Sequence, residues 1–234
     1  MKPSRWLGLY LLALPFLGGC RSSTIFYADF ESDTVGQAPA TSPPGNPKGD
    51  ILGTVGATVV EKLGLPPSVV NRKQLHLVAD ADPTSVSCTF KRNKNLTKPF
   101  YGGGKLVVIW SGWTFDPYGR PMIVEAQNNE GEAVARIKLH DGAFEVEGAP
   151  GFQNGYEGGD PHTASWSFDL TSKKVWFTVN LGEKVEMTKE IDLLAPLKGG
   201  LKRIHFGFAA EPAPHSEGSY HFETINATWA RASN

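Results

Sequence analysis

The sequence predicts an all-β fold in which two antiparallel sheets pack face to face. Aromatic residues make up 11% of the 234 residues, and the chain has 26 Gly and 17 Pro but only 20% charged residues. This composition is typical of a globular, β-rich domain. Short segments rich in Val, Ile, Phe, Trp and Thr are separated by Gly, Pro and Asn clusters, as strands are separated by turns. No long stretch has the apolar period of an amphipathic helix.

In chain order, the segments expected to form strands are 25–30, 57–61, 74–78, 85–91, 105–115, 122–128, 133–139, 143–146, 163–170, 174–181, 184–191, 202–209 and 219–230. They show no internal repeat, which favours two packed sheets over a propeller or a solenoid. The proline-containing segment 34–50 is expected to be an irregular loop, and 192–197 at most one short turn.

The clearest alternation of apolar and polar residues lies in segment 174–181. Val175 and Phe177 alternate with Trp176 and Asn180. Successive side chains of a strand point to opposite faces of a sheet. One face of this strand is therefore expected in the core, and the other is expected to be open.

The first residues have the features of a secretory leader. A short basic segment at 1–5 precedes an apolar run at 6–16, which as a helix would span only ~16 Å of a hydrocarbon core ~30 Å thick. We therefore expect a cleaved signal peptide at 1–19. Residues 20–24 are expected to form a short tether, and 25–234 a single domain.

The residues at the expected cleavage site are Leu17-Gly18-Gly19-Cys20, and they resemble the bacterial lipobox. The resemblance implies that Cys20 is acylated and anchors the domain to a membrane of the bacterial cell envelope. Arg21 in place of an acidic residue favours the outer membrane. The alternative is an ordinary signal peptide with a chance cysteine. Because Cys88 is the only other cysteine, it is expected to have no disulfide partner and to pack inward.

The charge balance argues against nucleic acid as a partner. The chain has 23 Lys and Arg against 24 Asp and Glu, a formal net charge of −1. A nucleic-acid binder normally needs a basic surface to neutralise phosphates.

Several segments together resemble the concanavalin A-like lectin and glucanase superfamily of jelly-roll domains. Residues 26–39, FYADFESDTVGQAP, resemble the opening of many secreted bacterial members. Residues 165–170 and 174–183 resemble the laminin G-like hairpin, and 204–208 and 220–225 its following core and closing strands. Leu181 between Asn180 and Gly182 departs from the usual turn. The resemblance implies a two-sheet jelly-roll sandwich with a concave face, used by carbohydrate-binding modules, lectins, glycoside hydrolases and polysaccharide lyases.

No catalytic residue is expected, because the motifs of the enzymes on this fold are absent. Laminarinase-type hydrolases carry closely spaced carboxylates on one strand, whereas Glu145 and Glu147 are followed by no third carboxylate until Glu157. The spacing of the alginate-lyase type is also missing around Gln127 and His140.

Candidate ligand-binding residues are planar polar and aromatic side chains expected on an open sheet face, since sugars stack on aromatic rings and bond to amides, carboxylates and guanidinium groups. They are Trp176, Asn180, Glu125, Gln127, Arg136, His205 and Trp110. A structural Ca²⁺ is a further candidate, because oxygen ligands can meet where the first and last strands pair. Its expected ligands are Asp29, Glu31 and Glu223.

The sequence thus predicts an acylated envelope lipoprotein whose jelly-roll domain binds a polysaccharide or envelope glycan without cleaving it. Two alternatives stay open. One is a polysaccharide lyase or glycoside hydrolase with a diverged motif, and the other is a structural lipoprotein that binds protein partners.

Overall fold

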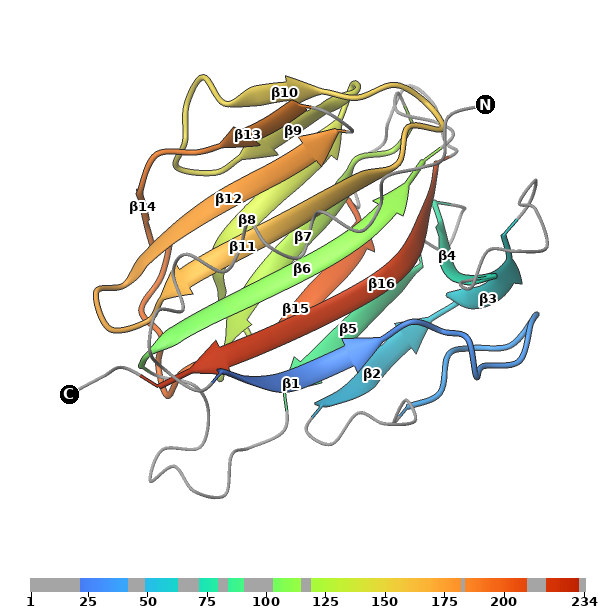
Figure 1. Ribbon diagram of the computed structural model, residues 1–234, viewed down its shortest axis with the longest axis horizontal. Helices are drawn as coiled ribbons and strands as arrows, with labels where there is room; N and C mark the ends of the chain where they lie inside the picture. Colours follow the sequence, from blue (N-terminus) through green and yellow to red (C-terminus); the bar gives the residue numbers. More distant parts are fainter. Residues whose placement is uncertain are drawn as a thin grey trace.

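Two antiparallel sheets form the domain in a computed structural model, which describes residues 22–41, 49–62, 72–79, 84–90, 103–114, 119–181, 184–209 and 218–231. Sheet A consists of β1 Ser22–Ala28, β3 Thr58–Glu61, β4 Lys73–Val78, β6 Lys105–Trp113, β11 His162–Asp169, β12 Lys174–Leu181, β13 Lys184–Met187, β14 Ile191–Asp192 and β16 Ser219–Ala230. Sheet B consists of β2 Gly49–Val55, β5 Ser85–Phe90, β7 Met122–Asn128, β8 Ala133–His140, β9 Ala143–Val146, β10 Gln153–Gly155 and β15 Leu201–Phe208. Figure 1 shows sheet A in front of sheet B.

The strand orders place distant parts of the chain side by side. The path through sheet A is β13-β12-β11-β6-β16-β4-β3, with β1 also paired to β16 and β14 to β12. The path through sheet B is β10-β9-β8-β7-β15-β5-β2. The predicted two-sheet jelly-roll sandwich is confirmed. The described residues contain no helix that is long and apolar enough to cross a membrane.

Alternating side chains from both sheets fill the space between them. Trp110 of β6 is fully buried and makes edge contacts with Trp166 of sheet A and Phe206 of sheet B, with ring centroids 5.6 and 5.8 Å apart. Cys88 is also fully buried, as predicted. Burial raises the pKa of its thiol. The prediction that Trp110 lies on an open face is wrong, because its strand presents it to the opposite sheet.

Two strands were not predicted, and both lie at the edges of sheet B. β2 starts at Gly49, within the segment expected to be a loop, and its register with β5 shifts between Leu52 and Val55. β10 has only three residues, including Gly155. Both strands contain glycine, at positions 49 and 53 of β2 and at 155 of β10, and glycine weakens the alternation by which a strand is recognised in a sequence.

The expected strand at 184–191 is divided into β13 and β14 by Thr188. Its N–H donates to the carbonyl of Phe177, and its hydroxyl accepts from the N–H of Phe177 at 3.0 Å. The side chain thereby takes the place of a backbone oxygen and interrupts the ladder.

The first strand begins earlier than predicted. β1 starts at Ser22 and pairs with the end of β16, where Ser22 lies opposite Ala230. Residues 22–24, expected to be part of a tether, are strand.

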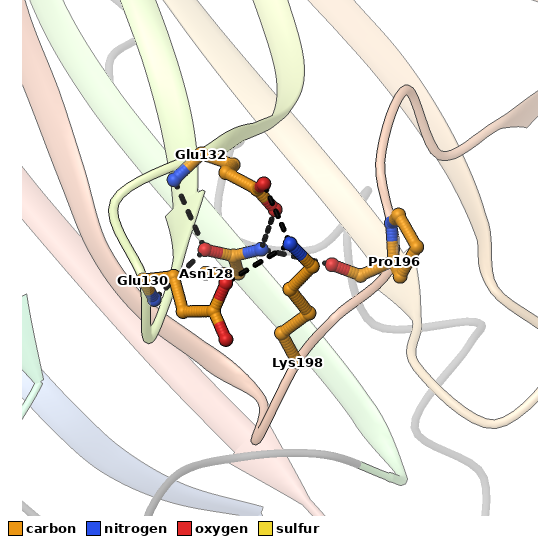
Figure 2. A network of polar contacts seen from close by, with 5 residues as sticks. All are labelled: Asn128, Glu130, Glu132, Pro196 and Lys198. Atoms are coloured by element: carbon orange, nitrogen blue, oxygen red, sulfur yellow. Dashed lines mark hydrogen bonds and ion pairs between the residues drawn. The ribbon is translucent and has the colours of Figure 1, made fainter.

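One polar network ties the β7–β8 hairpin to the segment before β15 (Figure 2). The fully buried Asn128 accepts from the N–H groups of Glu130 and Glu132 and donates to the carbonyl of Pro196 at 2.9 Å. Lys198 makes ion pairs with both glutamates, at 2.9 and 2.7 Å. This network fixes the end of β7, and therefore the register of the strands that carry the polar face described below.

Replacing Gly112 with alanine should destabilise the fold. A Cβ there would lie 2.3 Å from the carbonyl oxygen of His221 and 2.7 Å from the ring of Tyr220, and no rotamer change relieves contact with a backbone oxygen. We expect Gly112→Ala to lower the free energy of unfolding by about 2 kcal/mol or more, measured by urea denaturation. Gly103→Ala is the matched control, because its Cβ would meet only Thr171 Oγ1 at 3.8 Å. Equal stability of the two variants would contradict the close packing of β6 on β16.

His162 should make the fold less stable in acid. Its ring is buried beside Phe144 and hydrogen-bonds to the Tyr220 hydroxyl, and burial lowers its pKa from 6.5 to about 4. Because the unfolded chain binds this proton more readily, stability is full above pH 6.5 and falls as the pH drops towards 4. The loss from His162 alone is about 2 kcal/mol at pH 5.

The measurement is urea denaturation of the native chain and of His162→Gln at pH 7.5 and pH 5. At pH 7.5, His162→Gln should have a lower free energy of unfolding than the native chain. Between pH 7.5 and pH 5, its free energy of unfolding should fall by less than that of the native chain. An equal fall in the free energy of unfolding of both proteins would show that His162 does not contribute to the loss of stability in acid.

Candidate functional site

The outward face of sheet B carries a ladder of polar side chains that comes from three neighbouring strands. The strand pairing places Glu125 of β7 opposite Arg136 of β8 on one side and opposite His205 of β15 on the other. Since Val124 and Ala126 face the core, alternation turns Glu125 and Gln127 outward. The predicted residues Glu125, Gln127, Arg136 and His205 are therefore brought together.

Arg136 lies at the centre of this ladder. Its Nε donates to Glu125 at 2.8 Å, and its Nη1 donates to Glu147, just after β9, at 2.9 Å. Hydrogen bonds to the two carboxylates, that to Glu125 above all, raise the pKa of the Arg136 guanidinium. The ladder continues from Glu125 through Gln127 to Arg203 of β15. The planar groups thus hold each other in place before any ligand arrives.

A surface hollow of about 630 Å³ lies over one end of the ladder. Its lining consists of Ile123, Glu125, Arg136, Lys138, Glu145, Val146, Glu147 and Ala209. The lining contains three carboxylates and two cationic side chains, so its formal net charge is negative.

Several polar groups of the hollow have no hydrogen-bond or ion-pair partner among the described residues. They are the Lys138 ammonium, the Glu145 carboxylate and Nη2 of Arg136. A site that offers both donors and acceptors matches hydroxyl groups, which both donate and accept. The hollow can therefore bind a polyhydroxylated molecule through several hydrogen bonds at once.

His205 lies beside the hollow with one ring nitrogen engaged. Its Nδ1 is 2.9 Å from Oγ of Ser87, whereas Nε2 has no hydrogen-bond partner among the described residues. A Cβ on Gly207 would come within 2.9 Å of Nε2, so the glycine leaves room for the ring. Burial lowers the pKa of His205, while the nearby Glu125 raises it and Arg203 lowers it. The lowered pKa favours the neutral form of the ring at pH 7.

Trp176 and Asn180 do not join this site. They lie on β12, and their neighbours Val175, Phe177 and Val179 face the core, so both point outward from sheet A on the opposite side of the sandwich. The expectation that they share one face with Glu125 and Arg136 is wrong, because β12 and β7 belong to different sheets.

The candidate calcium ligands do not form a metal site. Across the ranges that the structure describes, no group of three or more His, Cys, Asp or Glu side chains could hold a metal ion. Glu223 forms an ion pair with Lys62, and Glu31 accepts from the backbone N–H of Lys73 at 2.9 Å. These contacts use the carboxylates to fasten β3 and β4 to their surroundings.

Arg203, Lys138 and Glu147 also lie at the site and were not among the predicted ligand-binding residues. Arg203 and Lys138 lie two residues from His205 and Arg136 on the same strands, so period-two alternation predicts that they share the face. Glu147 lies beyond the end of β9, and nothing in the strand pattern indicates its contact with Arg136.

Comparisons with known proteins bear on the fold. No protein-family model and no curated protein sequence matches the chain. Among solved structures, a GH131 β-glucanase catalytic domain from Podospora anserina has a TM-score of 0.51 at 10% identity, over 76% of this chain and 79% of its own. The CBM2 module of the evolved Dit of Lactobacillus casei BL23 phage J-1 has a TM-score of 0.49 at 11% identity, over 92% and 99%.

A third solved structure is a sialidase with a TM-score of 0.49 at 15% identity. The match covers 73% of this chain and only 16% of the sialidase. At these identities, the likeness to the β-glucanase shows the jelly-roll fold and nothing finer.

The surroundings of His205 can be tested by titration. Glu125→Gln should lower the pKa of His205 further, because it removes a negative charge that favours the imidazolium. Arg203→Gln should raise that pKa, because it removes a positive charge. The measurement is an NMR titration of the His205 ring, with Lys138→Gln as a control that changes a charge outside the set acting on His205. Shifts in the opposite directions would contradict the arrangement of β7 and β15.

Proposed function

We propose that the protein is an acylated lipoprotein of the bacterial cell envelope, and that the hollow on sheet B binds a glycan without cleaving it. The observation that supports binding is the ordered polar ladder centred on Arg136, with free donors and acceptors directed at a hollow of about 630 Å³. Pre-organised side chains lose little entropy on binding, so their hydrogen bonds contribute more fully to affinity.

The charges of the hollow favour a neutral glycan. Three carboxylates and two cations line it, so a polyanion such as a uronate polymer would meet a net negative surface. A neutral sugar meets no such repulsion, and its hydroxyl groups can pair with both Lys138 and Glu145. Ile123 and Ala209 supply apolar contact for the C–H groups of the ring.

The alternative of glycan cleavage has one observation in its favour, which is that three carboxylates, those of Glu125, Glu145 and Glu147, lie in the hollow. A glycoside hydrolase needs one carboxyl that carries a proton and one that does not. Here a single guanidinium donates to Glu125 and Glu147, an arrangement that suits two fixed acceptors, whereas Glu145 has no partner among the described residues. Binding is kept as the proposed function because the carboxylate spacing of the hydrolases on this fold is missing from the sequence.

Membrane attachment rests on the lipobox-like residues that end at Cys20, which lies outside the described residues. Ser22 starts the first strand, so an acyl-cysteine at position 20 would lie directly next to the folded domain. Acylation would hold the domain close to the membrane surface.

Affinity electrophoresis through gels that contain neutral and anionic polysaccharides tests the proposal. The chain from residue 21 onward should be retarded by a neutral polysaccharide. Lys138→Ala and Arg136→Gln should each weaken retardation, Arg136→Gln by about tenfold, which corresponds to one lost charge-assisted hydrogen bond. Trp176→Ala is the matched control, because it lies on the opposite face and should leave retardation unchanged.

The outcomes separate the candidate functions. Loss of retardation in Trp176→Ala alone would move the site to sheet A. Release of reducing ends or unsaturated products from the same polysaccharides would show an enzyme. Unchanged mobility with every polysaccharide would overturn the glycan proposal and leave a protein-binding role.

A further inference from the structure

The outward face of sheet A differs in kind from that of sheet B. Its three central rows of cross-strand neighbours contain no charged residue, and we call these rows the neutral face. Read from the β13 side, the rows are Val185–Asn180–Thr163–Ser111–Thr224, then Met187–Thr178–Ser165–Ile109–Asn226–Tyr27, then Trp176–Ser167–Val107–Thr228–Thr24. On sheet B, the corresponding rows carry the Glu147–Arg136–Glu125 ladder and Arg203.

The neutral face has an apolar stripe at its β13 edge. Val185 and Met187 are 45% and 55% exposed, and they lie opposite the outward residues Asn180 and Thr178. The two charged residues of β13 alternate with them, so Lys184 and Glu186 are directed to the other side, where they form an ion pair. The stripe places two apolar side chains on an edge strand, where a charged side chain would be the usual protection, and Trp176 lies on the neighbouring strand β12.

The predicted anchor emerges at the opposite edge of the same sheet. Cys20 precedes the first residue of β1 by two positions, and two residues of chain reach at most about 7 Å. β1 is paired to β16 and β13 to β12, with five strand spacings between β1 and β13, or roughly 24 Å at the usual separation. Ser22 itself ends the next row of the same outward face, Lys174–Asp169–Lys105–Ala230–Ser22, so the anchor would emerge beside charged residues that border the neutral face. The anchor and the apolar stripe would then hold the neutral face from opposite edges of the sheet.

We propose that the neutral face of sheet A lies against the surface of the lipid bilayer. The inference rests on the proposed acylation of Cys20. The partner that fits is a bilayer because the face combines exposed apolar side chains and a tryptophan with hydroxyl and amide groups, and it places no charge in its centre. This mixture suits the boundary between lipid headgroups and acyl chains, whereas the charged face of sheet B suits water.

The orientation has a consequence for the binding site. The two sheets pack face to face, so a domain that lies with sheet A on the membrane directs the outward face of sheet B away from it (Figure 1). The hollow around Arg136 then opens to the aqueous side, where a soluble or cell-wall glycan can reach it. Membrane attachment and glycan binding would therefore use opposite faces.

Spin labels report this orientation on the full acylated chain in phosphatidylcholine vesicles. The lipidated protein is prepared as Met187→Cys and, as the matched control, as Thr89→Cys on sheet B, opposite Arg203. Cys88 is fully buried, so the introduced thiol is the reactive one. We expect the label at 187 to collide several-fold more with membrane-dissolved oxygen than with a water-soluble nickel chelate, and the label at 89 to show the reverse.

The possible results distinguish a failure of the proposed orientation from a failure of the proposed anchor. A label at 187 that stays as accessible to the nickel chelate as the label at 89, in a chain shown by mass spectrometry to carry acyl groups, overturns the orientation and leaves the anchor intact. A chain without acyl groups overturns both the anchor and the orientation. A label at 187 that is shielded only when a neutral polysaccharide is added overturns the orientation and assigns the neutral face to a glycan. Glycan binding at the hollow is judged independently by the Lys138 and Arg136 variants.

Discussion

The packing of Trp110 between the sheets is the interaction on which the rest of the structure depends. Its ring meets Trp166 and Phe177 of sheet A and Phe206 of sheet B, and its indole is fully buried. Once this position faces inward, the alternation of β6 and of each strand paired in register with it is fixed, because a slip by one residue would expose the whole core face. The division of side chains into core, sheet A surface and sheet B surface follows from that register.

Because the register separates outward side chains from core side chains, the outward faces of sheet A and sheet B can differ strongly in charge. Side chains that point outward make few core contacts, so their chemistry is unconstrained by packing. On sheet B, Arg136 compensates Glu125 and Glu147, so charged groups are held near one another without the cost of leaving them unpaired. On sheet A, the outward positions of β11 and β6 within the three neutral rows are hydroxyl or aliphatic residues, joined by contacts such as the 2.8 Å hydrogen bond between Ser111 and Thr224. One sandwich thus presents two surfaces suited to different surroundings.

The sequence was sufficient for the features that depend on local periodicity. The bounds of β7, β9, β12 and β16 agree with prediction, because turn residues such as Pro121, Gly142 and Gly218 bound these segments and β12 also alternates apolar and polar residues. Periodicity also placed Trp176 outward and Cys88 inward. It did not reveal that Trp176 and Arg136 lie on different sheets, since sheet membership depends on the order in which strands pair. Nor did it separate Trp110 from the outward residues of its strand, because a single tryptophan suits either face.

The arrangement around Arg136 gives a physical reason why the proposed site would bind a glycan without cleaving it. Catalysis by carboxylates depends on two environments that differ enough to keep one group protonated, whereas a binding site gains from groups whose charges are already matched. Glu125 and Glu147 contact the same guanidinium, and Gln127 extends the network to Arg203. Any change that freed one carboxylate to act as an acid would also loosen the ladder that positions the other. Under the proposed binding function, the ladder would offer the hydroxyl groups of a glycan side chains that already hold one another in place, and the imidazole of His205 at its margin would add a further hydrogen-bonding group.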